Sequence, residues 1–230
     1  MKNIRINVLD KNHHIEVIDF KVDLLLLAGW TGRDKESVMK HIKELEAIGI
    51  PRPKKIPALY PISSYLIDTY NEIEVQTQQT SGEVEYVLFI NENIEYITVG
   101  SDHTDREIEK IDIKKSKQMY PKIIPPIVWK YDDVKDHWDG LILVSKQWIN
   151  GEEILYQNSS TKALITPSEL LKIINDYGLS CKNLIVFSGT IPTITNKLMF
   201  GEKFRMEIID PLLNRHILYE YNIKQLPKVD

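Results

Sequence analysis

The stretch at residues 83–90, EVEYVLFI, constrains the fold of this chain most, because it has the pattern of a β-strand with apolar residues on both faces. Successive side chains of a strand point to opposite sides of the sheet. One face carries Val84, Tyr86 and Leu88. The other face begins with Glu83 and Glu85 and continues with Val87 and Phe89. The pattern predicts a strand that is buried on both sides.

Two carboxylates therefore lie side by side on this strand. On a solvated face, Glu83 and Glu85 would experience only mild repulsion, and many strands carry such a pair. On a buried strand they need a counterion, because uncompensated carboxylates carry a large desolvation cost. A hard divalent cation that takes oxygen ligands is the natural partner.

A third carboxylate occurs shortly afterwards in VGSDHTDREIE. Asp102 is expected to follow a strand and a glycine, Gly100, that permits a tight chain reversal. Glu83, Glu85 and Asp102 would form a three-carboxylate metal site that leaves positions open for a substrate.

Other segments predict a mainly β protein with a few helices. An N-terminal hairpin is expected, because residues 4–8 and 15–17 alternate around a turn at residues 11–12. Helical spacing predicts helices at 34–48 and 167–177, and the prolines at 51–61 predict an extended wrapping loop. Further strands are expected at 94–99, 123–129, 141–144, 184–188, 204–209 and 216–221.

Length and composition favour one globular domain. The chain has 230 residues, 43% of them hydrophobic and 27% charged, and it lies near the upper size of a single core. No linker divides it. We expect one domain at 1–230, in which the hairpin and helix at about 1–50 pack on a β core at about 70–230.

Charge and apolar runs exclude several classes of partner. A net charge of -4 offers no general attraction for nucleic acid. The longest apolar run, Leu24–Gly29, is far too short to cross a membrane. The single cysteine, Cys181, rules out an intrachain disulfide and a multi-cysteine zinc site, and we expect it in the core. The expectation is a cytoplasmic protein without nucleic-acid or membrane partners.

Two further motifs could carry chemistry. His41 and Glu44 stand at i, i+3 on the first predicted helix and share one face, although an ordinary surface pair has the same spacing. The turn at residues 188–192, SGTIP, follows a strand. The backbone amides of this turn, with the hydroxyl of Thr190, could receive a carboxylate.

In their order along the chain, these motifs resemble those of the fumarylacetoacetate hydrolase superfamily. The H-x-x-E pair of the family falls on His41 and Glu44 in AGWTGRDKESVMKHIKELEAIGIPRP, and its metal carboxylates fall on GEVEYVLFI and GSDHTDREIE. Its active-site lysine falls on Lys117 in KKSKQMYPKIIPPIVW, whereas Lys114 and Lys115 are expected in solvent.

Later segments continue the resemblance. An R-Q pair and a threonine of the family fall on Tyr156, Gln157 and Thr161, and a G-T-P turn falls on Gly189 and Thr190. FGEKFRMEIIDPLLNRHILYEYNI resembles the closing hairpin. The chain is most similar to an uncharacterised branch of the superfamily, catalogued as a domain of unknown function. It departs from the family at Ser101, where an asparagine is usual, and at Asp105–Arg106, where the family has Arg-Asp.

The resemblance implies an α+β, predominantly β fold, a mixed β-sandwich roll with a few short helices, and a homodimer. It implies Mg²⁺ or Mn²⁺, with Ca²⁺ as an alternative, held by Glu83, Glu85 and Asp102. His41, Glu44 and Lys117 would be catalytic. Substrate-binding residues would be Gly189, Thr190, Gln157 and Arg106.

Three functions remain open at this point. The first is hydrolysis of a carbon–carbon bond in a small 2-oxo acid or acylpyruvate-like substrate. The second is decarboxylation or tautomerisation of an oxo acid on the same metal site. The third is binding of a small molecule without catalysis.

Overall fold

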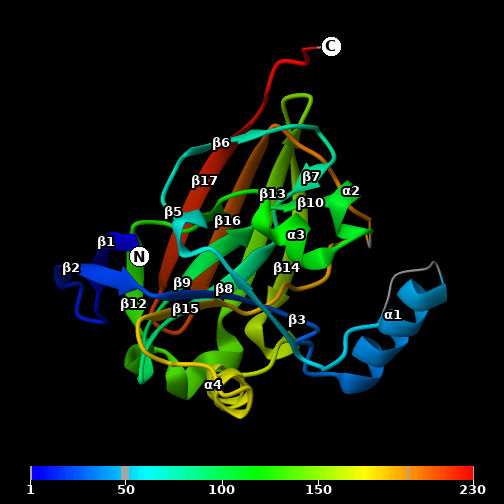
Figure 1. Ribbon diagram of the computed structural model, residues 1–230. Helices are drawn as coiled ribbons and strands as arrows, with labels where there is room; N and C mark the ends of the chain where they lie inside the picture. The colour runs from blue at the N-terminus through cyan, green and yellow to red at the C-terminus, as the bar shows by residue number, and fades with distance from the viewer. Residues whose placement is uncertain (1, 48–51, 196, 230) are drawn as a thin grey trace.

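The strand that carries the acidic pair, β8 (Val84–Asn91), lies in the interior of a ten-stranded mixed sheet. A computed structural model describes residues 2–47, 52–195 and 197–229 (Figure 1). Eight strands of the large sheet follow the order β2-β1-β12-β9-β8-β15-β3-β4, and the short β11 joins β9 to β5. The strands of this sheet are β1 Lys2–Leu9, β2 Ile15–Val22, β3 Leu24–Gly29, β4 Ala58–Ile62, β5 Ile67–Asp68, β8, β9 Asn93–Asp102, β11 Lys122–Ile123, β12 Ile127–Lys130 and β15 Leu184–Phe187.

A second, five-stranded sheet has the order β14-β13-β16-β17-β6, and β7 pairs with β10. These strands are β6 Glu72–Val75, β7 Thr80–Ser81, β10 Thr104–Asp105, β13 Ile142–Ile149, β14 Glu152–Ser160, β16 Lys203–Asp210 and β17 Arg215–Gln225. The α-helices are α1 Lys35–Ala47, α2 Arg106–Glu109, α3 Ile113–Gln118 and α4 Pro167–Asp176. The 3-10 helices are Ser64–Leu66, Tyr131–Asp133, Lys135–Gly140 and Thr161–Ala163.

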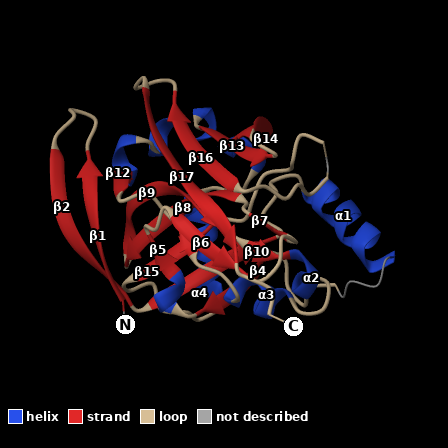
Figure 2. Ribbon diagram, turned by 90° about the horizontal axis from the view of Figure 1, so that it is seen from above, coloured by secondary structure: helices blue, strands red, loops and turns tan. Residues whose placement is uncertain are grey.

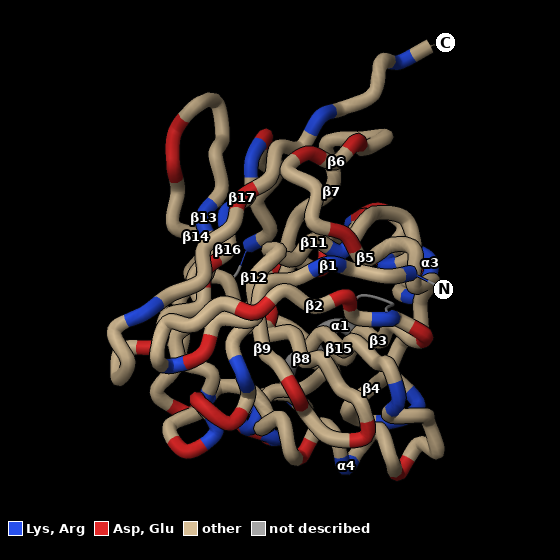
Figure 3. Tube along the Cα trace, turned by 90° about the vertical axis from the view of Figure 1, so that its left-hand side faces the viewer, with Lys and Arg blue, Asp and Glu red and all other residues tan. Residues whose placement is uncertain are grey.

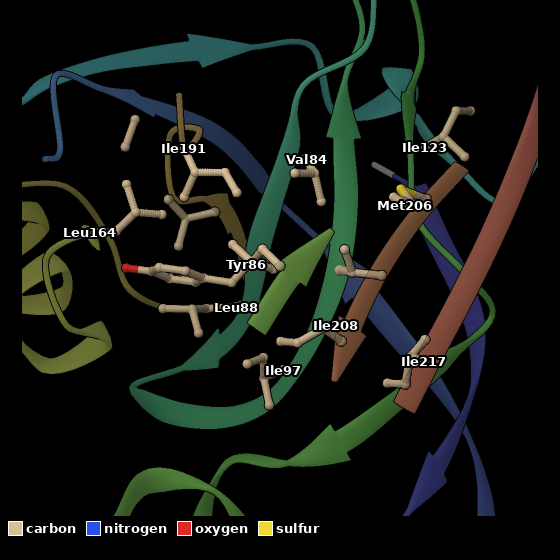
Figure 4. Packing of buried hydrophobic residues seen from close by; sticks show 14 of the residues in the cluster. Val84, Tyr86, Leu88, Ile97, Ile123, Leu164, Ile191, Met206, Ile208 and Ile217 are labelled. Atoms are coloured by element: carbon tan, nitrogen blue, oxygen red, sulfur yellow. The ribbon is translucent and has the colours of Figure 1, made fainter. Parts of the chain in front are cut away.

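One face of β8 contributes to the larger core. Val84, Tyr86 and Leu88 are fully buried and belong to one cluster with Met206 and Ile208 of the second sheet (Figure 4). The ring of Tyr86 meets the Trp138 ring edge-on at a centroid distance of 4.9 Å, a favourable aromatic geometry.

The other face of β8 is also covered, because the large sheet curls back on itself. Phe89 of β8 meets Phe20 of β2 in a T-shaped contact with centroids 5.0 Å apart, although several strands separate β2 from β8 in the sheet. Val87 belongs to the same cluster. The prediction of a strand buried on both sides is confirmed, and so is the predominantly β, α+β sandwich-roll fold.

The N-terminal hairpin forms as predicted. β1 and β2 pair antiparallel along their whole length. β1 also pairs in parallel with β12, so the hairpin extends the large sheet. The organisation as one domain stays a prediction.

Both predicted helices are present. α1 begins at Lys35, and its predicted end after Ala47 lies outside the described residues; α1 projects from the side of the sheets in Figures 1 and 2. In α4, Pro167 stands at the first turn, and Thr166 and Glu169 form a capping box, which satisfies amides that the first turn leaves free. Among the described residues, no helix is both long and apolar enough to span a membrane.

The segment predicted as a wrapping loop is partly a strand, and this prediction was wrong for residues 58–62. β4 pairs antiparallel with β3, and Pro61 stands opposite Leu26. β4 is the last strand of the sheet, and an edge strand tolerates a proline because its outer side needs no backbone donor. The run Leu24–Gly29, which was not assigned to a strand, forms β3.

Three further points of the sequence analysis need correction. The strand predicted at 123–129 is divided into β11 and β12, because Pro125 and Pro126 between them have no amide hydrogen for the ladder. β14 was not predicted, since its polar residues follow no clean alternation. Cys181 is partly exposed at the border of the core and not within it.

Charged side chains of both signs are interspersed along the chain trace (Figure 3). This distribution agrees with the small net charge of the chain.

Candidate metal centre

The end of the β8–β9 hairpin brings the three predicted carboxylates together. Glu83 immediately precedes β8, and the amide of Asp102 donates a hydrogen bond of 3.1 Å to the Glu83 carbonyl. Asp102 is the last residue of β9, and so it ends that strand instead of following it. One carboxylate oxygen from each of Glu83, Glu85 and Asp102 lies within 4.8 Å of the other two.

Gly100 has a different role from the one expected. It lies inside β9, directly opposite Glu85, and makes no chain reversal. A Cβ at this position would lie 2.5 Å from the ring of Phe187 and 2.5 Å from a methyl group of Val87. Gly100 therefore leaves room for the side chains of Phe187 and Val87.

Burial makes the acidic cluster electrostatically costly. Glu85 and Asp102 are buried, whereas 18% of the Glu83 side chain is exposed. Burial, and then the charge of Asp102, raise the pKa of the Glu85 carboxyl well above its usual range. The exposed part of Glu83 marks the side of the cluster that solvent reaches.

Two lysines neutralise Asp102. Lys117 forms an ion pair with one oxygen of Asp102, and its Nζ is 3.9 Å from Glu83 Oε2. Lys122 places its Nζ 2.8 Å from the other oxygen, Oδ1. Burial alone would raise the pKa of Asp102, but the two ammonium groups hold that pKa below its usual range. Sequence reasoning did not identify Lys122.

The helix α3 orients Lys117 inward, as predicted. Asp112 caps this helix by accepting hydrogen bonds from the amides of Lys114 and Lys115. The side chain of Lys117 is only 7% exposed, whereas Lys114 and Lys115 lie in solvent. The catalytic role of Lys117 stays a proposal.

Arg106 contacts the cluster directly. Its Nη2 is 3.0 Å from Glu83 Oε1 and its Nη1 is 2.8 Å from Glu109 Oε2. Its Nε donates a hydrogen bond of 2.8 Å to the Ser81 hydroxyl. Arg106 was predicted to bind substrate, and in the structure its guanidinium braces Glu83.

The SGT turn points into the same site. The amide of Gly189 donates a hydrogen bond of 2.7 Å to Glu85 Oε2, and the Thr190 hydroxyl donates one of 2.8 Å to the Val84 carbonyl. The turn was expected to receive the carboxylate of a substrate. In this structure its amide receives the carboxylate of Glu85.

Gln157 fixes this turn between the two sheets. Its Nε2 donates to Thr190 Oγ1 at 2.8 Å and to the Ile191 carbonyl at 2.6 Å. Its Oε1 accepts from the Val84 amide at 3.0 Å and from the Ser145 hydroxyl at 2.9 Å. Predicted to bind substrate, Gln157 has its hydrogen-bonding groups engaged by protein here.

The other two residues of that segment are also buried. Tyr156 is 1% exposed beside Phe204, with ring centroids 6.5 Å apart. The hydroxyl of Thr161 donates to the Trp138 carbonyl. Thr161 therefore anchors the connection between the sheets.

The predicted catalytic pair cannot be placed against the carboxylates. His41 and Glu44 belong to α1, but their side chains lie outside the part of the structure that is described. Their role as a pair stays a prediction.

A polar network unnoticed in the sequence supports the strand end behind Asp102. The hydroxyl of Tyr221 lies 2.8 Å from Ser101 Oγ and 2.9 Å from His103 Nδ1. All three side chains are buried, and burial lowers the pKa of His103 well below its usual value. The network joins the end of β9 to β17 of the other sheet.

The donor set fits a hard divalent cation. Its members offer only carboxylate oxygens, the ligands that Mg²⁺, Mn²⁺ and Ca²⁺ prefer. Lys117, Lys122 and Arg106 carry three positive charges, against the carboxylates of Glu83, Glu85, Asp102 and of Glu109, which shares Arg106 with Glu83. With a divalent cation added, the centre would be positively charged, which suits an anionic substrate.

Gly189 should tolerate no side chain. Its φ is +85°, and a Cβ would lie 2.4 Å from Thr31 Oγ1 and 3.2 Å from the Ala28 carbonyl oxygen. We expect Gly189→Ala to lower the free energy of unfolding by about 2–4 kcal/mol, which combines backbone strain and overpacking. Urea unfolding followed by circular dichroism measures this loss.

Gly178 supplies the matched control. It also has a positive φ, +70°, but a Cβ there would meet nothing within 4 Å. Gly178→Ala should cost only the backbone strain, about 1 kcal/mol. Equal losses in the two variants would show that the close approach at Gly189 is unimportant.

Comparisons with known proteins identify the family and the fold of the chain. A family model described as "Protein of unknown function (DUF2848)" matches residues 28–221. A search of curated proteins found no match.

Solved structures with the same fold include three whose names are informative. A yeast protein of the fumarylacetoacetate hydrolase family is 17% identical, with a TM-score of 0.62 over 90% of this chain and 95% of its own. A 2-keto-3-deoxy-D-arabinonate dehydratase complexed with magnesium and 2,5-dioxopentanoate is 15% identical, with a TM-score of 0.62 over 92% and 77%. A 5-carboxymethyl-2-hydroxymuconate delta-isomerase from Mycobacterium smegmatis is 14% identical, with a TM-score of 0.63 over 91% and 82%.

Proposed function

Because this chain belongs to the DUF2848 family and has the fumarylacetoacetate hydrolase fold, we propose that it is a divalent-metal-dependent enzyme acting on a small 2-oxo acid. One observation carries this proposal: carboxylate oxygens of Glu83, Glu85 and Asp102 meet within 4.8 Å at a buried strand end. Such a cluster is costly unless cations accompany it.

The structural neighbours support a magnesium-type ion. The dehydratase of the same fold is complexed with magnesium and a dioxo compound. We assign Mg²⁺ or Mn²⁺ to the centre of this chain, with Ca²⁺ as the alternative, because all three take oxygen ligands. When bound, the metal would act as a Lewis acid on the oxo group of the substrate.

The chain's own residues divide the remaining work. Arg106 holds Glu83, and the amide of Gly189 holds Glu85. Lys117, whose ammonium lies beside both Asp102 and Glu83, stabilises negative charge that develops on the substrate oxygen. A rigid set of ligands and one adjacent ammonium group favour an enolate-like transition state.

Two reaction classes follow from this stabilisation. In the first, a carbon–carbon bond of an acylpyruvate-like substrate is hydrolysed, with His41 and Glu44 activating water. In the second, an oxo acid is decarboxylated or tautomerised without a water nucleophile. The isomerase among the structural neighbours supports keeping the second class. A binding protein without activity is the third outcome.

A substrate panel in labelled water separates these outcomes. Purified protein with Mg²⁺ or Mn²⁺ is incubated with acylpyruvates, oxaloacetate and related oxo acids in H₂¹⁸O, and the products are analysed by mass spectrometry. A hydrolase places ¹⁸O in the new carboxylate in addition to the exchange seen without enzyme. A decarboxylase releases CO₂, and a tautomerase changes only the proton positions. Turnover of none of these compounds would favour the binding protein.

Glu83→Gln should weaken Mn²⁺ binding on the order of 10- to 100-fold and leave the fold intact, because it removes one charged ligand from the partly exposed edge of the cluster. Isothermal titration calorimetry measures the affinity. Glu152→Gln, at an exposed residue of β14, is the control for the loss of one acidic side chain. Unchanged Mn²⁺ affinity in Glu83→Gln would remove Glu83 from the ligand set.

We also infer a homodimer for the active form, in keeping with the family resemblance. Sedimentation velocity of the purified protein tests it directly. A species near 26.8 kDa at micromolar concentration would contradict the dimer.

A further inference from the structure

Lys122 is a buried lysine next to the candidate metal centre to which neither the sequence motifs nor the proposed chemistry gives a role. Its side chain has no exposed surface. A lysine is rarely buried in this way unless it is paired, and burial lowers the pKa of its ammonium group. Burying the ammonium group is costly unless it is paired with a negative charge and hydrogen-bonded.

The backbone of Lys122 is fixed on two sides. β11 pairs antiparallel with β9, where Lys122 stands directly opposite Asp102. β11 also pairs in parallel with β5, where Lys122 stands opposite Ile67. The register of β11 on β9 therefore places the side chain of Lys122 beside that of Asp102.

The ammonium group is held as firmly as the backbone. Its Nζ is 2.8 Å from Asp102 Oδ1 and donates a hydrogen bond of 2.6 Å to the carbonyl of His103. These two acceptors belong to consecutive residues at the end of β9. Lys122 is thereby tied to the ligand side chain and to the backbone that carries it.

Lys117 reaches the other oxygen of the same carboxylate in a different way. It comes from the six-residue helix α3, its side chain is 7% exposed, and its Nζ also approaches Glu83. The two oxygens of Asp102 thus contact two lysines. One lysine belongs to the sheet and the other to a short helix.

We propose that Lys122 is a positioning residue for the metal centre: it retains Asp102 Oδ1, so that Asp102 presents to the cation only Oδ2, the oxygen that Lys117 also contacts. This inference rests on the proposed function. It assigns to Lys122 a geometric role, whereas Lys117 acts on the substrate.

Charge and geometry predict opposite effects when Lys122 is removed. If Lys122 contributed only positive charge, Lys122→Met would strengthen cation binding, because it removes a like charge from the neighbourhood. If Lys122 positions Asp102, the same variant releases the carboxylate. Cation binding then weakens, and Asp102 can chelate with both oxygens, which displaces a coordinated water.

The test uses Mn²⁺ as the probe with wild type, Lys122→Met, Lys122→Gln and Lys117→Met. Electron paramagnetic resonance of free Mn²⁺ gives the affinity, and water-proton relaxation gives the number of waters on bound Mn²⁺. Lys122→Gln retains a neutral donor in place of the ammonium group, so it can hold one of the two acceptors and carries the test if Lys122→Met does not fold. Lys117→Met is the matched control, since it removes the same charge from the same carboxylate.

We expect Lys122→Met to weaken Mn²⁺ binding at least about 10-fold, as loss of an outer partner of a ligand does, and to lose one coordinated water. Lys122→Gln should change both quantities in the same direction by less. Lys117→Met should bind Mn²⁺ at least as tightly as wild type, with the same number of waters.

Two results would overturn the inference in distinguishable ways. In the first, wild type binds Mn²⁺, and the Lys122 variants bind it equally or more tightly with the same number of coordinated waters. Lys122 would then contribute only its positive charge, and the proposed function would stand. Failure of wild type itself to bind Mn²⁺ would refute the proposed function, and the positioning role with it.

Discussion

Asp102→Asn should destabilise the protein by about 3–5 kcal/mol even in the presence of a chelator. The substitution keeps the size of the side chain but leaves the ammonium groups of Lys117 and Lys122 buried without their carboxylate, and breaking a buried pair from one side has a cost of this size. Urea unfolding in EDTA measures the difference without any contribution from bound metal.

A double variant shows where that loss originates. Adding Lys122→Met to Asp102→Asn should restore part of the stability, with a coupling energy of about 1–3 kcal/mol between the two positions. Asp136→Asn, at an exposed aspartate, should change stability by less than about 0.5 kcal/mol. If Asp102→Asn is as stable as this control, the lysines do not depend on Asp102 for their burial.

Lys117→Met should lower kcat by about 10²- to 10³-fold on a substrate identified from the oxo-acid panel, the range measured when one group that stabilises developing negative charge is removed. The value of KM should change much less, because the contact strengthens as charge develops and therefore acts mainly on the transition state. Steady-state kinetics at saturating Mn²⁺ gives both parameters.

Lys114→Met is the appropriate control for this experiment, because Lys114 lies on the same helix but in solvent. Its kcat should stay within about twofold of wild type, as expected of an exposed residue away from the site. Similar small effects from both variants would remove Lys117 from the proposed mechanism.

The sequence was most informative where one strand satisfied two requirements at once. Alternation in β8 shows an apolar face on each side, and that pattern requires burial of Glu85 together with its neighbours. The prediction of a metal site in the acidic trio, Glu83, Glu85 and Asp102, started from this burial. The inward orientation of Lys117 was predicted from the resemblance to the family, because Lys117 falls on the family's lysine position.

The sequence was least informative where pairing partners create the structure. Lys122 stands in YPKIIPP, just before the strand predicted at 123–129, and the two-residue β11 forms only because β5 and β9 lie on either side. The contacts of Gln157 were equally difficult to predict, since its four hydrogen bonds join segments that are distant along the chain. No local pattern reveals such tertiary contacts.

The location of the acidic trio on a single hairpin has a consequence for chain entropy. The partners of Asp102 and His103 are near in sequence: Lys117 is 15 residues from Asp102 and Lys122 is 19 residues from His103. Closing such loops is entropically inexpensive, and each doubling of length adds about 0.6 kcal/mol. The contact between Glu85 and Gly189 spans 104 residues. The charged centre can thus assemble from one contiguous stretch of chain, whereas its anchoring turn arrives from a distant one.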